Sequence, residues 1–64
     1  MKLREIKKGT YFTRKRIDYP SENQVWVRGD YDRSLKKYEC WIWSDVNDTF
    51  FIDGNREVYT DFIF

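Results

Sequence analysis

The stretch from Gln24 to Trp43, QVWVRGDYDRSLKKYECWIW, limits the possible fold more than any other part of the chain. Two kinds of side chain alternate along it on both sides of a short polar segment. One kind is small and apolar, namely Val25 and Val27 before the segment and Cys40 and Ile42 after it. Alternation with a period of two is typical of half-buried strands, which favour β-branched and aromatic residues. The sequence therefore predicts a central β-hairpin.

The alternation also assigns two faces to this hairpin. We expect the small apolar residues to point inward, with Cys40 among them. The side chains between them are tryptophans and charged residues, which we expect to point outward: Trp26, Arg28, Glu39, Trp41 and Trp43. A glycine inside a strand commonly marks a bend or a bulge, and we expect one at Gly29.

Two registers of the hairpin are compatible with its cross-strand pairs. A four-residue loop, 32–35, would place Tyr31 opposite Lys36, and a six-residue loop would place Tyr31 opposite Tyr38. Both alternatives keep the same faces because they differ by two residues. A shift of one residue would turn the side chains of one strand to the opposite face.

The rest of the chain is divided by turn signals at close spacing. We expect a helical turn or an extended stretch over 1–8, a strand over 10–17, a loop over 18–23, a polar connection over 44–48, a fourth strand over 49–52, a tight turn over 53–55 and a fifth strand over 56–64. In the first strand we expect Phe12 in the core, with Tyr11 and Thr13 facing outward. Five short strands predict an all-β fold, either a small five-stranded SH3-like barrel or a strongly bent antiparallel sheet. The N-terminal stretch would add at most one short helical turn.

The chain of 64 residues is long enough for one domain, spanning 1–64, and for one small core. Small cores need large apolar side chains, disulfides or a metal. Cys40 is the one cysteine and there is no histidine, so the sequence predicts neither a disulfide nor a zinc site. Aromatic residues make up 20% of the chain, and we expect their rings to supply most of the buried area.

The sequence predicts no enzyme and no cofactor. Cys40 has no histidine to activate it, so we expect it to act as a small buried hydrophobe. The acidic residues Asp45, Asp48 and Asp53 lie in predicted turns, where aspartate serves the backbone. We therefore expect no metal ligands among them.

Several features predict a cytoplasmic protein. Met1 leads into KLREIKKG, which lacks the apolar region of a signal peptide. No apolar run approaches the roughly 18 residues that crossing a membrane requires. A single thiol suits a reducing compartment.

The charge is unevenly distributed, although the net charge is only +1. Residues 1–16 carry seven bases and one acid, whereas residues 17–64 carry five bases and ten acids. Such a chain can offer a basic edge to a partner or can pair its two parts internally.

The segments LREIKKGTYF, VWVRGDYD, KKYECW and VYTDFIF resemble small uncharacterised proteins of bacteria and their mobile elements. Those proteins begin with Leu-x-x-(Leu/Ile)-x-x-Gly-(Asp)-x-Phe and continue into five strands. Leu3, Ile6, Gly9 and Phe12 occupy these positions, and Thr10 departs from the acidic residue. The resemblance implies an SH3-like barrel and carries no activity or catalytic residue.

Three function classes follow from the tryptophans and the basic residues. If Trp26, Trp41 and Trp43 point outward together, they form an apolar patch of the size that marks an interaction site. This favours a module that binds a protein partner or itself, unless the N-terminal segment or the residues 62–64 cover the patch.

The alternative is a nucleic-acid accessory protein. Bases of a single strand would stack on the same tryptophans, and basic side chains would follow the backbone. The candidates for these backbone contacts are Arg14, Lys15, Arg16 and Arg28. A structural subunit of a larger assembly is the third class.

Overall fold

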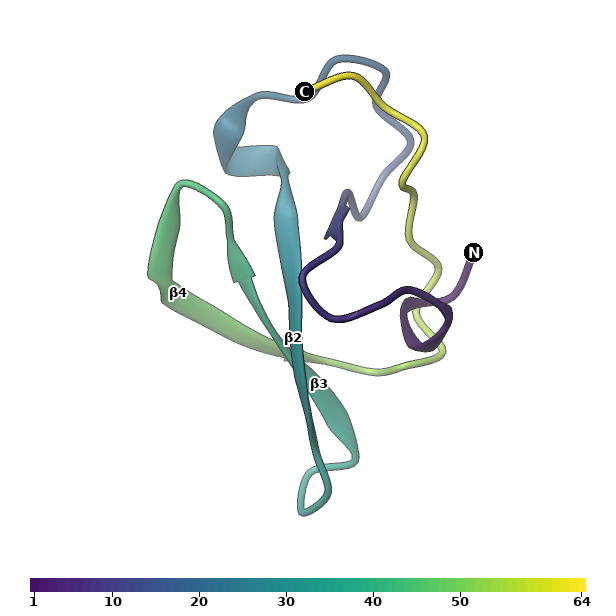
Figure 1. Cartoon of the computed structure of the whole chain (residues 1–64), viewed down its shortest axis with the longest axis vertical. Coiled ribbons are helices and arrows are strands. Elements are labelled where there is room, and N and C mark those ends of the chain that lie inside the picture. Colours follow the sequence, from purple (N-terminus) through teal and green to yellow (C-terminus); the bar gives the residue numbers. More distant parts are fainter.

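The computed structural model describes all residues 1–64 and has four strands in one antiparallel sheet (Figure 1). The strands are β1 (Tyr11–Phe12), β2 (Trp26–Asp32), β3 (Lys37–Ile42) and β4 (Asp45–Ile52), which follow one another in this order across the sheet. Two 3-10 turns complete the regular structure, η1 (Leu3–Glu5) and η2 (Glu22–Gln24). The predicted all-β class is therefore confirmed, whereas the sheet has four strands and is not closed. No helix of the chain is long and apolar enough to cross a membrane.

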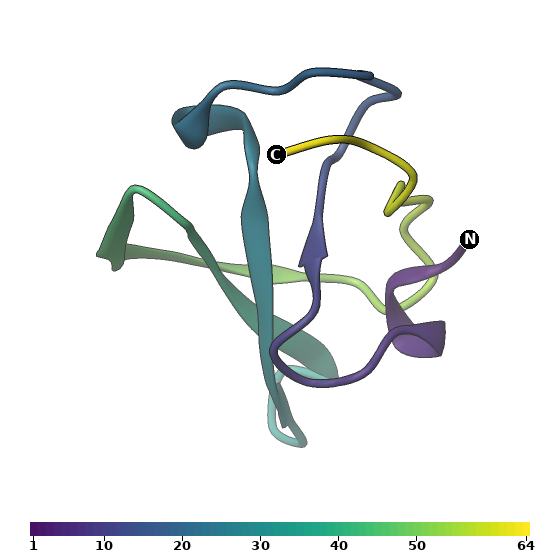
Figure 2. The same cartoon turned by 45° about the horizontal axis from the view of Figure 1, so that its top comes forward.

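The fifth strand predicted over 56–64 does not form. The segment makes isolated bridges instead, and in one of them Thr13 and Tyr59 exchange backbone hydrogen bonds of 2.8 and 3.0 Å. The backbone N–H of Val58 donates to the carbonyl of Met1 at 2.7 Å. Because the partner changes between neighbouring residues, no continuous ladder can develop. Figure 2 shows this segment passing η1 and then crossing the chain just after β1.

The first strand is shorter than the predicted range 10–17. Phe12 is fully buried, as predicted, but Thr13 is also fully buried, so its predicted outward orientation is wrong. Both backbone groups of Thr13 bond to Tyr59, and its hydroxyl donates to the carbonyl of Lys15 at 2.6 Å. These contacts draw the chain away from β2 after two paired residues.

The β2–β3 hairpin contains a bulge that changes its register. Near the tip Tyr31 lies opposite Tyr38, which was the pair predicted for the longer loop. Further along, Arg28 lies opposite Cys40, so three steps along β2 correspond to two steps along β3. The extra residue lies next to Gly29, where the sequence predicts a bulge. A shift of one residue turns the preceding side chains of β2 to the opposite face.

This shift separates the tryptophans, contrary to the prediction. Trp26 lies opposite Ile42 and is buried in the core with Cys40. Val27 lies opposite Trp41 on the other side of the sheet. We call the side that carries Trp26 and Cys40 the core face, and the side that carries Val27 and Trp41 the outer face. Of the residues predicted to point inward, Cys40 and Ile42 lie on the core face, whereas Val27 lies on the outer face with Trp41. Val25 and Val27 are nevertheless both buried.

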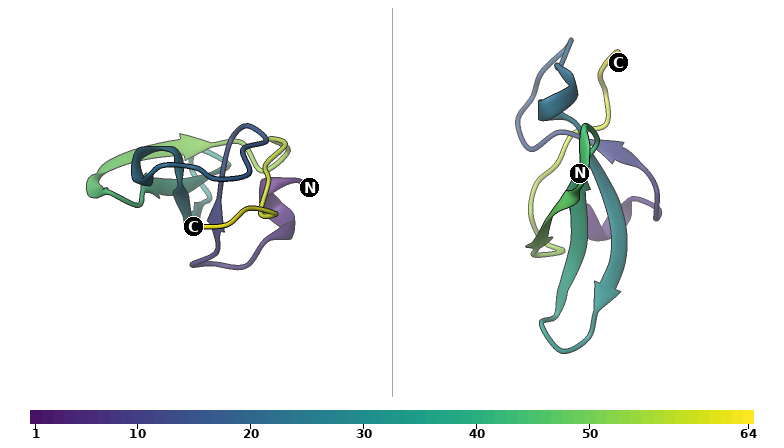
Figure 3. Two further views of the ribbon diagram at one scale, coloured as in Figure 1. Left: turned by 90° about the horizontal axis from the view of Figure 1, so that it is seen from above. Right: turned by 90° about the vertical axis from the view of Figure 1, so that its left-hand side faces the viewer.

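The core lies between the sheet on one side and η1 with the C-terminal segment on the other (Figure 3). Its members come from every part of the chain: Leu3, Ile6, Phe12, Trp26, Cys40, Ile52 and Val58. Leu3 and Ile6 enter it from the N-terminal turn, so of the two predictions for 1–8 the helical turn is correct.

The predicted polar connection over 44–48 is wrong in its extent, because β4 already begins at Asp45. Only 49–52, the predicted fourth strand, pairs continuously with β3, and the register breaks between Trp41 and Ile42. The turn over 53–55 forms as predicted. Its Asp53 carboxylate accepts a hydrogen bond of 2.8 Å from the backbone N–H of Asn55.

The buried thiol of Cys40 predicts an alkaline loss of stability. Burial raises the pKa of this thiol above its ordinary value. The folded chain therefore keeps its proton at a pH where the unfolded chain loses it. This stabilisation is complete below the ordinary thiol pKa of about 8.5 and is lost as the pH rises through the folded pKa.

We expect urea unfolding between pH 7 and 10 to show a steeper decline for the natural chain than for Cys40→Ala. The difference in slope should appear as the pH rises above the ordinary pKa of the thiol. The two chains differ only at residue 40, so the contributions of all other groups cancel in the comparison. Parallel declines would contradict the prediction.

Candidate functional site

Aromatic side chains gather on the outer face of the sheet. The indole N–H of Trp43 donates to the hydroxyl of Tyr11 at 3.3 Å. The ring of Phe64 packs edge-on against both, with centroid distances of 5.2 Å to Trp43 and 6.3 Å to Tyr11. Trp41 and Phe51 lie on the same face of the neighbouring strands β3 and β4. We call these five residues the aromatic surface.

The aromatic surface is only partly covered by the chain. Tyr11, Trp43, Phe51 and Phe64 are each between 42% and 51% exposed. The predicted outward orientation is thus correct for Trp41 and Trp43 and wrong for Trp26. The predicted covering by 62–64 is realised in part, because Phe64 packs on Trp43 while both remain accessible. Sequence reasoning missed Tyr11 and Phe51 as neighbours of the tryptophans, since only strand pairing places them there.

The strand β4 forms an open edge next to this surface. Its backbone hydrogen bonds run only to β3, and the residues 45–51 are all exposed. The opposite edge of the sheet, at β1, is bridged by the C-terminal segment. An exposed edge strand offers a row of unpaired N–H and C=O groups that can pair with another chain.

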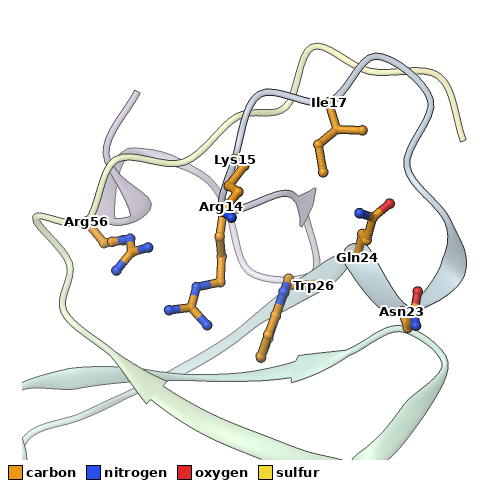
Figure 4. A pocket seen from close by; sticks show the side chains of 7 residues that line it. All are labelled: Arg14, Lys15, Ile17, Asn23, Gln24, Trp26 and Arg56. Atoms are coloured by element: carbon orange, nitrogen blue, oxygen red, sulfur yellow. The ribbon is translucent and has the colours of Figure 1, made fainter.

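A pocket of about 400 Å³ lies on another part of the molecule (Figure 4). We call it the basic pocket, and it is lined by Arg14, Lys15, Ile17, Asn23, Gln24, Trp26 and Arg56. Figure 4 shows Arg14 between Arg56 and Trp26, and the Arg14 guanidinium carbon lies 5.4 Å from the centre of the indole ring. No carboxylate lines this pocket.

The structure brings together only part of the predicted basic set. Arg14 and Lys15 line the basic pocket, whereas Arg16 lines a different pocket of about 270 Å³ together with Asp61. Arg28 lies on the core face, where its guanidinium carbon is 4.2 Å from the centre of the Tyr38 ring.

Arg56 is a pocket residue that sequence reasoning missed. It follows the turn over 53–55, far along the chain from Arg14, and no local pattern links the two residues. Only the tertiary fold brings them to one pocket.

No group of three or more histidine, cysteine, aspartate or glutamate side chains is placed to hold a metal ion. Comparison with protein-family models, with curated proteins and with solved structures finds no match. The candidate functions therefore rest on the geometry of these two surfaces.

Proposed function

We propose that this protein is a non-enzymatic interaction module that binds an extended strand of a protein partner along β4. The observation that carries the proposal is the open edge of β4 beside a half-exposed aromatic surface. An added strand would gain backbone hydrogen bonds from the edge, and its side chains would find apolar contacts next to Phe51. Both the backbone hydrogen bonds and the apolar contacts favour a partner segment in an extended conformation.

The charges of β4 specify the chemistry of this partner. Asp45 and Asp48 are exposed near one end of the strand, whereas Phe50 and Phe51 are exposed near the other. Opposite charges and aromatic pairs across strands stabilise a sheet by roughly 0.2–1 kcal/mol each. A strand with lysine or arginine at one end and apolar residues at the other would complement this edge.

We also propose that the sheet that carries this site is part of an SH3-like barrel. The support for this architecture is the C-terminal segment, which is bridged to Thr13 at the edge of β1, where a fifth strand would continue the sheet.

A random peptide library selected on the immobilised protein tests the proposal. Selected peptides should combine basic and apolar positions in extended spacing, and in NMR spectra they should shift the amides of 45–52. We expect Phe51→Lys to weaken their binding at least tenfold. Leu35→Lys, which introduces the same charge at an exposed site in the hairpin loop, should leave it unchanged.

Two results would overturn this function. Peptides that shift amides elsewhere would place the interaction on another surface. A concentration-dependent dimer in sedimentation, abolished by Phe51→Lys, would assign the edge to a second copy of the chain and make it a subunit of an assembly.

A further inference from the structure

We propose that the basic pocket is a second binding site, independent of β4, that binds a phosphate group. Three cationic side chains, Arg14, Lys15 and Arg56, line one concave space. Its volume of about 400 Å³ lies within the usual range of small-molecule sites. The pocket opens to solvent because these three side chains are exposed.

None of the three cations has an acidic partner in the chain. The ion pairs of the structure join the N-terminal amine to Glu57 and Lys8 to Asp30. The positive charges of the pocket are therefore uncompensated, and a bound anion would relieve their mutual repulsion. Charge-assisted hydrogen bonds from arginine to phosphate are among the strongest that proteins make.

The amide side chains of the pocket point to the same ligand. The side-chain oxygen of Gln24 accepts a hydrogen bond from the backbone N–H of Ser21 at 2.9 Å. The side-chain oxygen of Asn23 accepts one from the Ser21 hydroxyl at 2.6 Å. These oxygens are thus occupied, and the amide nitrogens remain as donors. Figure 4 shows the nitrogen of Gln24 on the side toward Arg14 and Trp26. A pocket lined by hydrogen-bond donors favours a ligand that offers hydrogen-bond acceptors, as the oxygens of a phosphate group do.

Trp26 limits what else the ligand can contain. The Arg14 guanidinium lies over its ring, Phe50 packs edge-to-face with it at a centroid distance of 5.1 Å, and only 7% of the residue is exposed. The indole therefore has no free face on which a nucleobase could stack. Its contact with Arg14 holds the guanidinium in place before a ligand arrives. The pocket should accordingly recognise phosphate without preference among bases.

This phosphate could belong to a free nucleotide or to the backbone of a single-stranded nucleic acid. We propose titrating the ¹⁵N-labelled protein with inorganic phosphate, with adenosine monophosphate and with a twelve-residue oligothymidylate. Each probe that binds should shift the backbone amides of 14–15, 23–24 and 56. A much tighter complex with the oligonucleotide would identify the nucleic-acid backbone as the source, and equal affinities would identify the free phosphate.

Charge-matched variants separate a built site from general electrostatic attraction. Arg56→Gln should weaken binding at least tenfold, and with the oligonucleotide it should lower the slope of log affinity against log salt by about 1. Arg16→Gln removes the same charge from a different pocket and should leave affinity unchanged. Equal losses in both variants, or no amide shifts with any phosphate probe, would overturn the site. The Arg56 side chain is exposed and is not a member of the core, so the test does not depend on the packing of Arg14 against Trp26.

Discussion

Replacing Gly29 with alanine should destabilise the fold by about 3 kcal/mol, at the upper end of the usual cost of overpacking. A Cβ at this position would lie 2.4 Å from the carbonyl oxygen of Glu39 and 2.7 Å from an edge carbon of the Trp41 ring. The carbonyl belongs to the paired strand β3 and cannot move without breaking the bulge. Folded domains are generally stable by only about 5–15 kcal/mol, so urea unfolding should show a large loss.

Gly9 offers a control with the opposite environment. Its φ is +86°, and nothing lies within 4 Å of the position that an added methyl group would take, so Gly9→Ala meets only backbone strain. That strain costs roughly 1–2 kcal/mol. We therefore expect Gly29→Ala to be the more damaging change. If Gly29→Ala unfolded at the same urea concentration as the natural chain, the close packing of the bulge would be wrong.

Replacing Trp26 with alanine should cost about 4 kcal/mol, as expected for a large buried aromatic side chain. Trp26 is a core residue that is 7% exposed, and Phe50 and Arg14 pack against its ring from the more exposed side. Loss of its ring leaves a cavity that neighbouring strands cannot fill. Thermal or urea unfolding followed by circular dichroism would measure the loss.

Trp43 provides the matched comparison, because it is 42% exposed on the outer face. Trp43→Ala should cost about 1 kcal/mol or less, as for most surface substitutions. Equal costs at the two positions would contradict the division of the tryptophans between two faces.

Short-range patterns predicted several parts of this fold correctly. The central hairpin, the bulge at Gly29, the buried Cys40, the buried Phe12 and the turn over 53–55 each depend on a few neighbouring residues. Period-two alternation, an internal glycine and turn residues report such local structure directly.

The faces of β2 could not be predicted in the same way. The sequence predicts the bulge, but a bulge moves every earlier side chain of the strand to the other face. Trp26 and Val27 are adjacent, and both are buried, one on each side of the sheet. Their residue types alone therefore do not show which side faces the core. Packing against Phe12 and Phe50 decides it.

The basic pocket and the C-terminal segment depend on long-range contacts. Arg56 reaches the pocket only because the turn after β4 returns the chain toward Arg14. The segment 56–64 alternates like a strand, yet its hydrogen bonds go to Met1, Thr13 and Asp18 in turn. The segment 56–64 has no single neighbouring strand with which it could pair along its length. Its alternating pattern therefore does not lead to a strand.

The difference between the two edges of the sheet also bears on how many partner strands one molecule can bind. The C-terminal segment is bridged to Thr13 directly after β1, whereas β4 pairs only with β3, so β4 is the edge that we propose for a partner strand. A molecule that offers one edge can accept one partner strand or pair edge to edge with one second copy, and such a pair is closed. If β4 binds a strand as proposed, we expect one partner strand or one second copy of the chain per molecule.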